Sequence, residues 1–183
     1  MNASTPVEPT KGRMGLSLVY DLLEVFVSAL IVVAVIFTFF FRTAGVEGPS
    51  MNDTLQNEDR LIMYNFCYTP QRGDIVIVNR YHDGDISITK PLIKRVIGVA
   101  GDTVKVTPDT VYLNGEPLDE PYVNYPNSPY GVEVTVPEGQ VFVMGDHRNA
   151  SNDSRALGCF DVEDIMGKAL WRIFPSDKFG SVY

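Results

Sequence analysis

The sequence predicts an all-β domain, curled or barrel-like, that follows one N-terminal transmembrane helix. Two observations favour this fold class: an apolar segment at residues 16–41, and many short β-type segments separated by turn residues over 42–183. With 183 residues, the chain has room for one domain and an appendage. We therefore expect a cytoplasmic tail at residues 1–15, the transmembrane helix, and an extracytoplasmic β-domain.

The apolar segment carries no charged residue from Val25 to Phe41. At about 1.5 Å per residue it spans roughly 25 Å, and one further turn crosses the hydrocarbon layer. A cleavable signal peptide is the alternative, but its apolar region is shorter and ends at small residues, whereas this one ends in three phenylalanines. Lys11 and Arg13 precede the segment and Arg42 follows it, which favours a cytoplasmic N-terminus.

Short apolar or alternating segments bounded by turn residues predict the strands. These segments are residues 60–68, 74–80, 92–100, 110–113, 132–136, 140–144 and 168–174. Asn114-Gly115 predicts a two-residue hairpin, and Asp83-Gly84-Asp85 predicts another turn. Residues 119–131 hold three prolines and predict an irregular loop within a smaller hairpin insertion at 107–136. A short helix is expected only at residues 162–165.

The charge and the cysteines limit the possible partners. The formal net charge is −8, and residues 43–183 carry 12 Lys and Arg against 20 Asp and Glu. Nucleic acid is therefore excluded, because its binding needs a basic footprint. Cys67 and Cys159 match no metal-ligand spacing, so no metal site is expected. They could form a disulfide outside the cytoplasm, but two isolated buried thiols are the favoured interpretation.

Strand alternation singles out Lys94. It shares a face with Leu92, Val96 and Gly98, which are apolar or lack a side chain. A lysine desolvated in this way has a lowered pKa, and its neutral amine can take a proton from a serine hydroxyl. The same pattern also fits a lysine that extends to solvent at a strand edge. The Gly-Pro-Ser-Met sequence at residues 48–51 would hold such a serine on an irregular loop.

Residues 145–155 form a dense polar segment after an apolar one. They hold two each of Asp, Arg, Ser and Asn, which suits a tight hydrogen-bonded turn. A solvated loop or a cation site is the alternative, although the spacing does not match an EF-hand. His147 invites a Ser-His-Asp interpretation, but nothing in the sequence orients it towards Ser50, and a loop histidine is favoured.

These blocks, in this order after a single anchor, resemble the type I signal peptidase family. The similar blocks are residues 48–51 with 54–55, 59–60, 72–76, 94–98 with 101–102, and 145–155. The resemblance implies a serine endopeptidase, with residues 42–183 as its catalytic domain. It would remove signal peptides from exported pre-proteins after Ala-x-Ala-like sites, at the outer face of the cell membrane. The implied partners are signal peptides and the lipid bilayer, with no cofactor or metal, and we expect a monomer.

Carried over residue by residue, the resemblance implies Ser50 as the nucleophile and Lys94 as the general base of a Ser-Lys dyad. Ser151 would hydrogen-bond the lysine amine. The residues expected to brace or shape the site are the ion pair Asp153 and Arg155, the turn residues Asp146 and Arg148, and Met51 beside the serine.

Two positions depart from the family pattern. Asp53 stands where the family usually has proline, which changes the rigidity of the loop. Gly48 stands where some members have a serine whose hydroxyl helps the oxyanion hole. The Ser50 N–H remains as one hydrogen-bond donor to the oxyanion, and the identity of the second donor is in question.

Two other functions stay open at this point: a Ser-Lys protease of the self-cleaving repressor type, and a non-catalytic, membrane-tethered β-domain that binds exported peptides.

Overall fold

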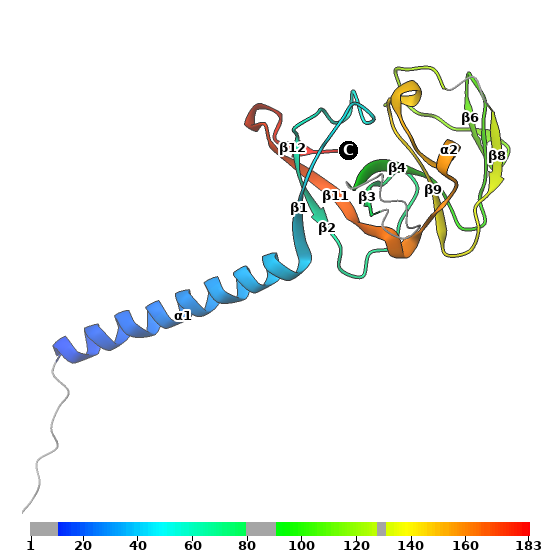
Figure 1. The fold of residues 1–183 in the computed structure, drawn as a ribbon. Helices are drawn as coiled ribbons and strands as arrows, with labels where there is room; N and C mark the ends of the chain where they lie inside the picture. The colour runs from blue at the N-terminus through cyan, green and yellow to red at the C-terminus, as the bar shows by residue number, and fades with distance from the viewer. Residues whose placement is uncertain (1–10, 80–90, 128–130) are drawn as a thin grey trace, which may run out of the picture. The chain divides into compact units, whose positions relative to one another are not determined.

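The computed structural model describes residues 11–79, 91–127 and 131–183, with the backbone alone at 11–16. The turn predicted at residues 83–85 lies outside these ranges. The chain divides into two compact units, Met1–Phe39 and Phe40–Tyr183, and each is described by itself (Figure 1).

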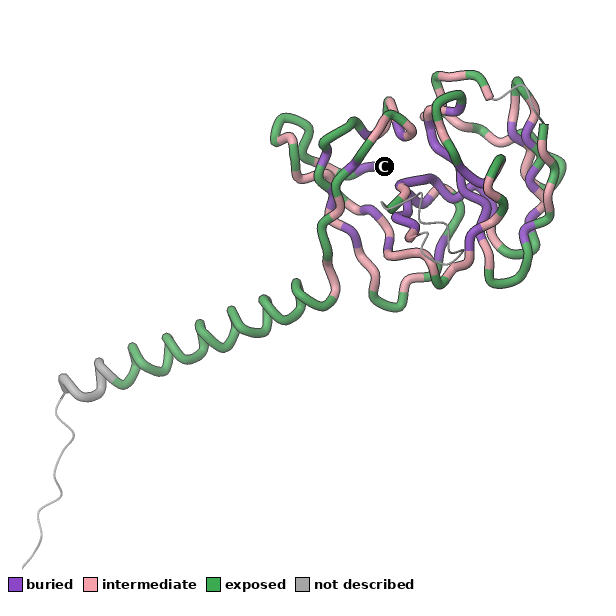
Figure 2. Tube along the Cα trace, viewed as in Figure 1, coloured by how far each residue is buried: buried purple, intermediate pink, exposed green. Residues whose placement is uncertain are grey.

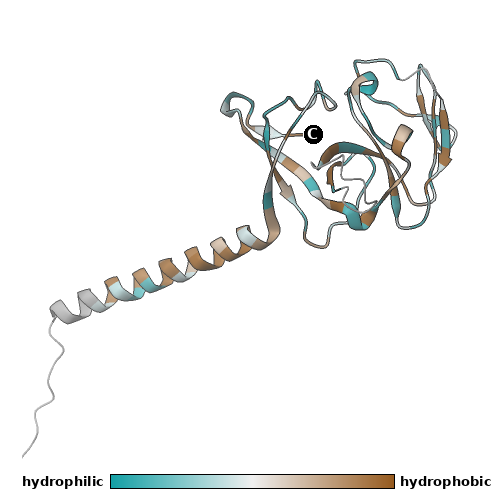
Figure 3. Cartoon of the chain, viewed as in Figure 1, coloured by the Kyte–Doolittle hydropathy of each residue, from teal (hydrophilic) through white to brown (hydrophobic). Residues whose placement is uncertain are grey.

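The first unit contains helix α1 (Lys11–Phe40). Its Ser17–Phe40 part is long and apolar enough to cross a membrane, and none of it is buried in protein (Figures 2 and 3). A helix that is apolar on all its exposed faces needs an apolar surrounding, which a bilayer provides. The predicted end of the helix is one residue too late, because Phe41 is the first residue of a strand and pairs with Tyr64.

The second unit consists of two antiparallel sheets, which confirms the predicted all-β class. The first sheet has the order β1-β2-β11-β3-β4-β9-β10, with β12 beside β11. Its strands are β1 (Phe41–Gly45), β2 (Arg60–Tyr64), β3 (Ile75–Val78), β4 (Leu92–Val99), β9 (Gln140–Met144), β10 (Phe160–Asp161), β11 (Ile165–Phe174) and β12 (Gly180–Ser181). The second sheet has the order β7-β6-β5-β8. Its strands are β5 (Thr103–Val106), β6 (Val111–Leu113), β7 (Glu116–Pro117) and β8 (Val132–Thr135).

Most predicted strands are present, but their bounds differ. The segment predicted at residues 60–68 ends as a strand at Tyr64, and β1 was not predicted, because its apolar start continues the apolar helix. The hairpin at Asn114-Gly115 joins β6 to β7, and both of its residues have the positive φ that this turn requires. The second sheet begins at Thr103, a few residues before the insertion expected at 107–136.

Short helices lie mostly outside the stretch predicted to hold them. They are η2 (Arg148–Ala150), α2 (Ser154–Leu157), η3 (Val162–Asp164) and η4 (Ser176–Lys178). Only η3 lies within the stretch expected to be helical. Helix α2 depends on local capping, because the Asp153 side chain accepts a hydrogen bond from the Arg155 N–H.

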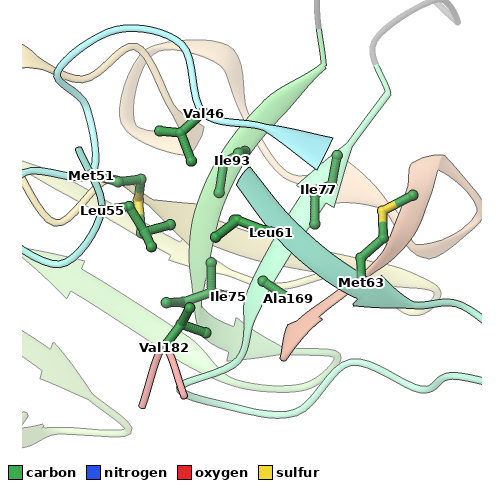
Figure 4. Packing of buried hydrophobic residues seen from close by; sticks show 10 residues of the cluster. All are labelled: Val46, Met51, Leu55, Leu61, Met63, Ile75, Ile77, Ile93, Ala169 and Val182. Carbon is green, nitrogen blue, oxygen red and sulfur yellow. The ribbon is translucent and has the colours of Figure 1, made fainter. Parts of the chain in front are cut away.

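The core of the first sheet extends into the loop that carries Ser50. Met51 and Leu55 are buried and pack with Leu61, Ile75 and Ile93 from the strands (Figure 4). Burial of such side chains stabilises the fold by about 1.5–3 kcal/mol each. Val46, which precedes Ser50, belongs to the same cluster, so the chain is held on both sides of Ser50 by the core that positions β4.

Candidate active site

The nucleophile loop, named for the role expected of Ser50 and defined here as residues 48–55, is a compact turn with Ser50 near its start. The Asn52 N–H donates to the Pro49 carbonyl at 3.0 Å, and the Leu55 N–H donates to the Met51 carbonyl at 2.8 Å. Gly48 has φ +82°, which glycine adopts without strain. These bonds and the buried Met51 limit how far Ser50 can move.

Lys94 lies in the middle of the first sheet, on β4, where Val76 is its cross-strand partner. Its side chain is 3% exposed. The Nζ atom lies 2.8 Å from Ser50 Oγ and donates to the Ile93 carbonyl at 3.1 Å. The structure thus places the amine inside the protein in direct contact with the Ser50 hydroxyl, and not at a solvent-exposed strand edge.

Burial lowers the pKa of the Lys94 amine from about 10.5 to about 8, because the charged form loses its hydration. The charge of Arg155 lowers this pKa further, whereas the carboxylates of Asp153 and Asp146 raise it. Desolvation has the largest effect. At pH 7 a pKa of about 8 leaves about a tenth of the amine neutral, compared with about one molecule in 3,000 at the ordinary value.

The catalytic turn, named for the role that the resemblance implies and defined here as residues 145–155, is organised around Asp153. Its carboxylate accepts bonds from Arg155 Nε and Nη2, each at 2.8 Å, and from the Gly145 N–H at 2.9 Å. Burial raises the Asp153 pKa, but the bonds and the charge of Arg155 outweigh it and leave the pKa below its ordinary value. The ion pair therefore holds the start of the turn against its end.

Gly145 lies against both Ser50 and Ser151. A Cβ atom at position 145 would lie 2.3 Å from Ser151 Oγ and 2.4 Å from the Ser50 carbonyl oxygen. Only a glycine allows this approach, so both serines pack against one backbone position. The hydrogen bond expected from Ser151 to the Lys94 amine is not formed, and the Ser151 hydroxyl instead helps to lower the pKa of the Asp153 carboxyl.

The two residues expected to support the turn, Asp146 and Arg148, each bind a partner outside it. Asp146 accepts bonds from Arg95 at 2.9 and 2.7 Å and from the Thr54 hydroxyl at 2.6 Å. Arg148, which is 1% exposed, pairs with Glu120 and also donates through Nε to the Gly145 carbonyl at 3.2 Å. Asp146 thus ties β4 to the nucleophile loop, and Arg148 ties the turn to the loop that follows β7.

These partners were not predicted. Thr54 and Gly145 lie inside blocks that the sequence analysis quoted, but their contacts join segments far apart in the chain. By strand alternation Arg95 falls on the face opposite Lys94, between Ile93 and Ile97. The burial of an always-charged side chain there is the signal that a carboxylate partner had to exist.

His147 contacts the backbone of the nucleophile loop. Its main-chain N–H donates to the Ser50 carbonyl at 3.0 Å, and the ring atom Nδ1 lies 3.2 Å from the Pro49 carbonyl oxygen. Its ring stacks on Tyr125, with 3.6 Å between ring centroids. These contacts do not involve the Ser50 hydroxyl, so the geometry does not support a Ser-His-Asp triad.

Cys67 and Cys159 are both free, and Cys67 is exposed. The burial expected for the Cys67 thiol is wrong, because the predicted strand ends before it and Cys67 lies in a turn with φ +46°. Within the described ranges, no group of His, Cys, Asp or Glu side chains could hold a metal ion.

An all-β domain that brings a serine hydroxyl against the amine of a buried lysine holds the two groups that a serine-type peptidase with a lysine base would need. The model of a peptidase family described as signal peptidase, peptidase S26, matches residues 19–174. This chain therefore belongs to the signal peptidase family, peptidase S26.

Two sequence relatives, from Synechocystis and Bacillus, agree with this assignment. A probable signal peptidase I-1 of Synechocystis sp. is 38% identical, and the match covers 83% of this chain and 81% of the relative. A signal peptidase I of Bacillus licheniformis is 36% identical, with 87% and 90% covered. The crystal structure of a signal peptidase I from Enterococcus faecalis is 32% identical, with a TM-score of 0.45 and coverage of 55% and 97%.

Proposed function

We propose that this protein removes N-terminal signal peptides from exported pre-proteins, with Ser50 as the nucleophile and Lys94 as the general base. The observation that carries the proposal is the 2.8 Å contact between Ser50 Oγ and an Nζ whose pKa is lowered to about 8. A neutral amine has a lone pair for the hydroxyl proton, which an ammonium lacks. Membership of the signal peptidase family supports the choice of substrate.

In the proposed reaction, Lys94 takes the Ser50 proton while Oγ attacks the scissile carbonyl carbon. The resulting ammonium then gives that proton to the departing amine, which becomes the N-terminus of the mature protein. Lys94, neutral again, takes a proton from water, and the hydroxide attacks the ester on Ser50. The signal peptide leaves with a new carboxylate, and Ser50 regains its proton.

The developing oxyanion needs hydrogen-bond donors, and the Ser50 N–H is the first of them. The Gly48 N–H already donates to Asn57 Oδ1 at 2.9 Å, so it is not the second in this geometry. Losing one such donor typically costs about 2.7–4 kcal/mol of transition-state stabilisation. A rearrangement on substrate binding, or a water molecule, would supply the second hydrogen-bond donor to the oxyanion.

The first sheet offers a place for an extended peptide. Strand β1 is at the end of the sheet order, so its outer edge has backbone groups available for pairing. Beside it lies a hollow of about 250 Å³. Its lining includes Ala44, Met63, Ile77, Ile93 and Met166. An apolar hollow next to the strand that carries Lys94 suits the small apolar side chains of an Ala-x-Ala site.

We place the β-domain outside the cytoplasm, with α1 as a single-pass anchor. Lys11 and Arg13 before the apolar stretch, against Arg42 after it, support this orientation. A pre-protein held in the same bilayer by its own apolar segment would then meet the site by lateral diffusion. Tethering both partners raises their effective concentration without any new contact.

The test is incubation of the detergent-solubilised full chain with a synthetic precursor that contains one Ala-x-Ala site. Mass spectrometry should find one cut, directly after the second alanine, and a transient ester on the peptide that contains Ser50. Absence of any cut, with the protein folded by circular dichroism, would overturn the proposal.

A substitution at Gly145 should also stop the reaction. The added methyl group of Gly145→Ala would overlap the Ser50 carbonyl and Ser151 Oγ, and a displacement of about 1 Å can cost roughly 100-fold in rate. We expect kcat/KM for the precursor to fall at least about 100-fold. Gly180→Ala is the control, since no atom lies within 4 Å of its added methyl group. Equal rates for the two variants would show that the close approach at Gly145 is not needed.

A further inference from the structure

A segment that the sequence predicts to be an irregular loop reaches across to the candidate site. Residues 120–127, called the strap here, follow β7 of the second sheet. They contact both the nucleophile loop and the catalytic turn, which lie in other parts of the chain. The strap is therefore positioned to influence the geometry of Ser50.

The first half of the strap is fixed by buried charges. Glu120 forms an ion pair with the buried Arg148. The Tyr122 ring lies under the Arg95 guanidinium, 3.9 Å from its carbon to the ring centroid, a distance typical of cation–π contact. Arg95 is the residue that binds Asp146. These contacts anchor the strap to the rigid part of the site.

The second half contacts the two segments that flank Ser50. Asn124 Nδ2 donates to Asp53 Oδ2 at 2.9 Å, and the Tyr125 hydroxyl donates to Asp53 Oδ1 at 3.4 Å. The Tyr125 ring stacks on His147 with an interplanar angle of 17°. The main-chain N–H of His147 in turn donates to the Ser50 carbonyl. Asp53, where the family usually has proline, is thus an anchor point for the strap.

We propose that Tyr125 and Asn124 are positioning residues that clamp the nucleophile loop to the catalytic turn, through His147 and Asp53, and so keep Ser50 Oγ within reach of Lys94. This inference rests on the proposed function of the site. Asn124 is exposed and Tyr125 is half-buried, so neither is a core residue whose loss would unfold the domain. Their contacts end on Asp53, three residues after Ser50, and on His147, whose main-chain N–H donates to the Ser50 carbonyl.

A clamp of this kind acts on the chemical step and not on the binding of the precursor. Without the Tyr125 ring, His147 loses its stacking partner, and its main-chain N–H is held less firmly against the Ser50 carbonyl. Small errors in the distance between nucleophile and base cost large factors in rate. We therefore expect Tyr125→Ala to lower kcat at least about tenfold with KM within about twofold of the wild type.

The experiment measures kcat, KM and the melting temperature with the synthetic precursor. Tyr125→Phe keeps the ring and should restore kcat to within about threefold of the wild type, whereas Asn124→Ala should lower kcat by a smaller factor than Tyr125→Ala. Tyr112→Ala is the matched control, since Tyr112 is also half-buried but lines a hollow on the second sheet with Lys105 and Glu133. It should cleave at the wild-type rate.

A double-mutant cycle separates positioning from general structural loss. If Tyr125 acts through His147, Tyr125→Ala should cost little more in a His147→Ala background. Additive losses, or an unchanged kcat with a raised KM, would overturn the inference. A wild-type chain that cuts no precursor would instead overturn the proposed function, and a wild-type rate in Tyr125→Ala would overturn the clamp alone.

Discussion

Ser50→Ala is expected to lower the rate of precursor cleavage by at least about 10⁴-fold, the scale seen when a serine peptidase loses its nucleophile. The variant keeps Lys94 and the loop, because Met51 and Leu55 still anchor the loop in the core. Binding of the precursor should therefore change by no more than about twofold. Both quantities are measurable on the same preparation, by mass spectrometry and by fluorescence titration.

This result separates a peptidase from a membrane-tethered domain that only binds exported peptides. Ser176→Ala is the control, because Ser176 is an exposed residue of η4. It should cleave at the wild-type rate. If Ser50→Ala still cut the precursor at a comparable rate, another residue would be the nucleophile, and the contact between Ser50 and Lys94 would have another purpose.

Lys94→Arg should be nearly as damaging as Lys94→Ala, with kcat lowered by about 10³-fold or more. The substitution keeps the positive charge but removes the possibility of a neutral base, since a guanidinium stays protonated in proteins. The charge of the Arg155 guanidinium already acts on this position, where it lowers the pKa of the Lys94 amine. A steady-state assay over pH 6 to 10 checks the prediction.

Lys105→Arg provides the matched control, because Lys105 lies on the second sheet in an exposed ion pair with Glu133. Its activity should equal that of the wild type, as surface ion pairs contribute little. If Lys94→Arg retained substantial activity, the positive charge of Lys94, and not its lone pair, would be what the reaction needs.

The sequence predicted the fold class and the pairing of Ser50 with Lys94, for two different reasons. The strands follow from local alternation and turn residues, which act over a few positions. The serine and the lysine were linked only through the resemblance, because they are 44 positions apart and no local pattern joins them. Alternation alone left Lys94 open to an exposed interpretation, and the packing of β4 between β3 and β9 excludes it.

The rest of the site depends on contacts between distant segments. Arg95 binds Asp146 and Arg148 binds Glu120, and neither partner can be chosen from sequence among so many carboxylates. The bond expected between Ser151 and Lys94 is absent even though the residues match the family blocks. Motifs thus indicate which side chains gather at a site, whereas the hydrogen bonds among them depend on packing.

The most direct test of the account is the pKa of the Lys94 amine itself. It can be measured by following the ¹⁵Nζ resonance of labelled lysine from pH 6 to 12 in the Ser50→Ala protein, with Lys94→Gln added to identify the signal. We predict a midpoint of about 8, and in the wild type a kcat/KM that rises with pH through that value as the amine becomes neutral. A midpoint near 10.5, the ordinary value for an exposed lysine, would contradict the central claim.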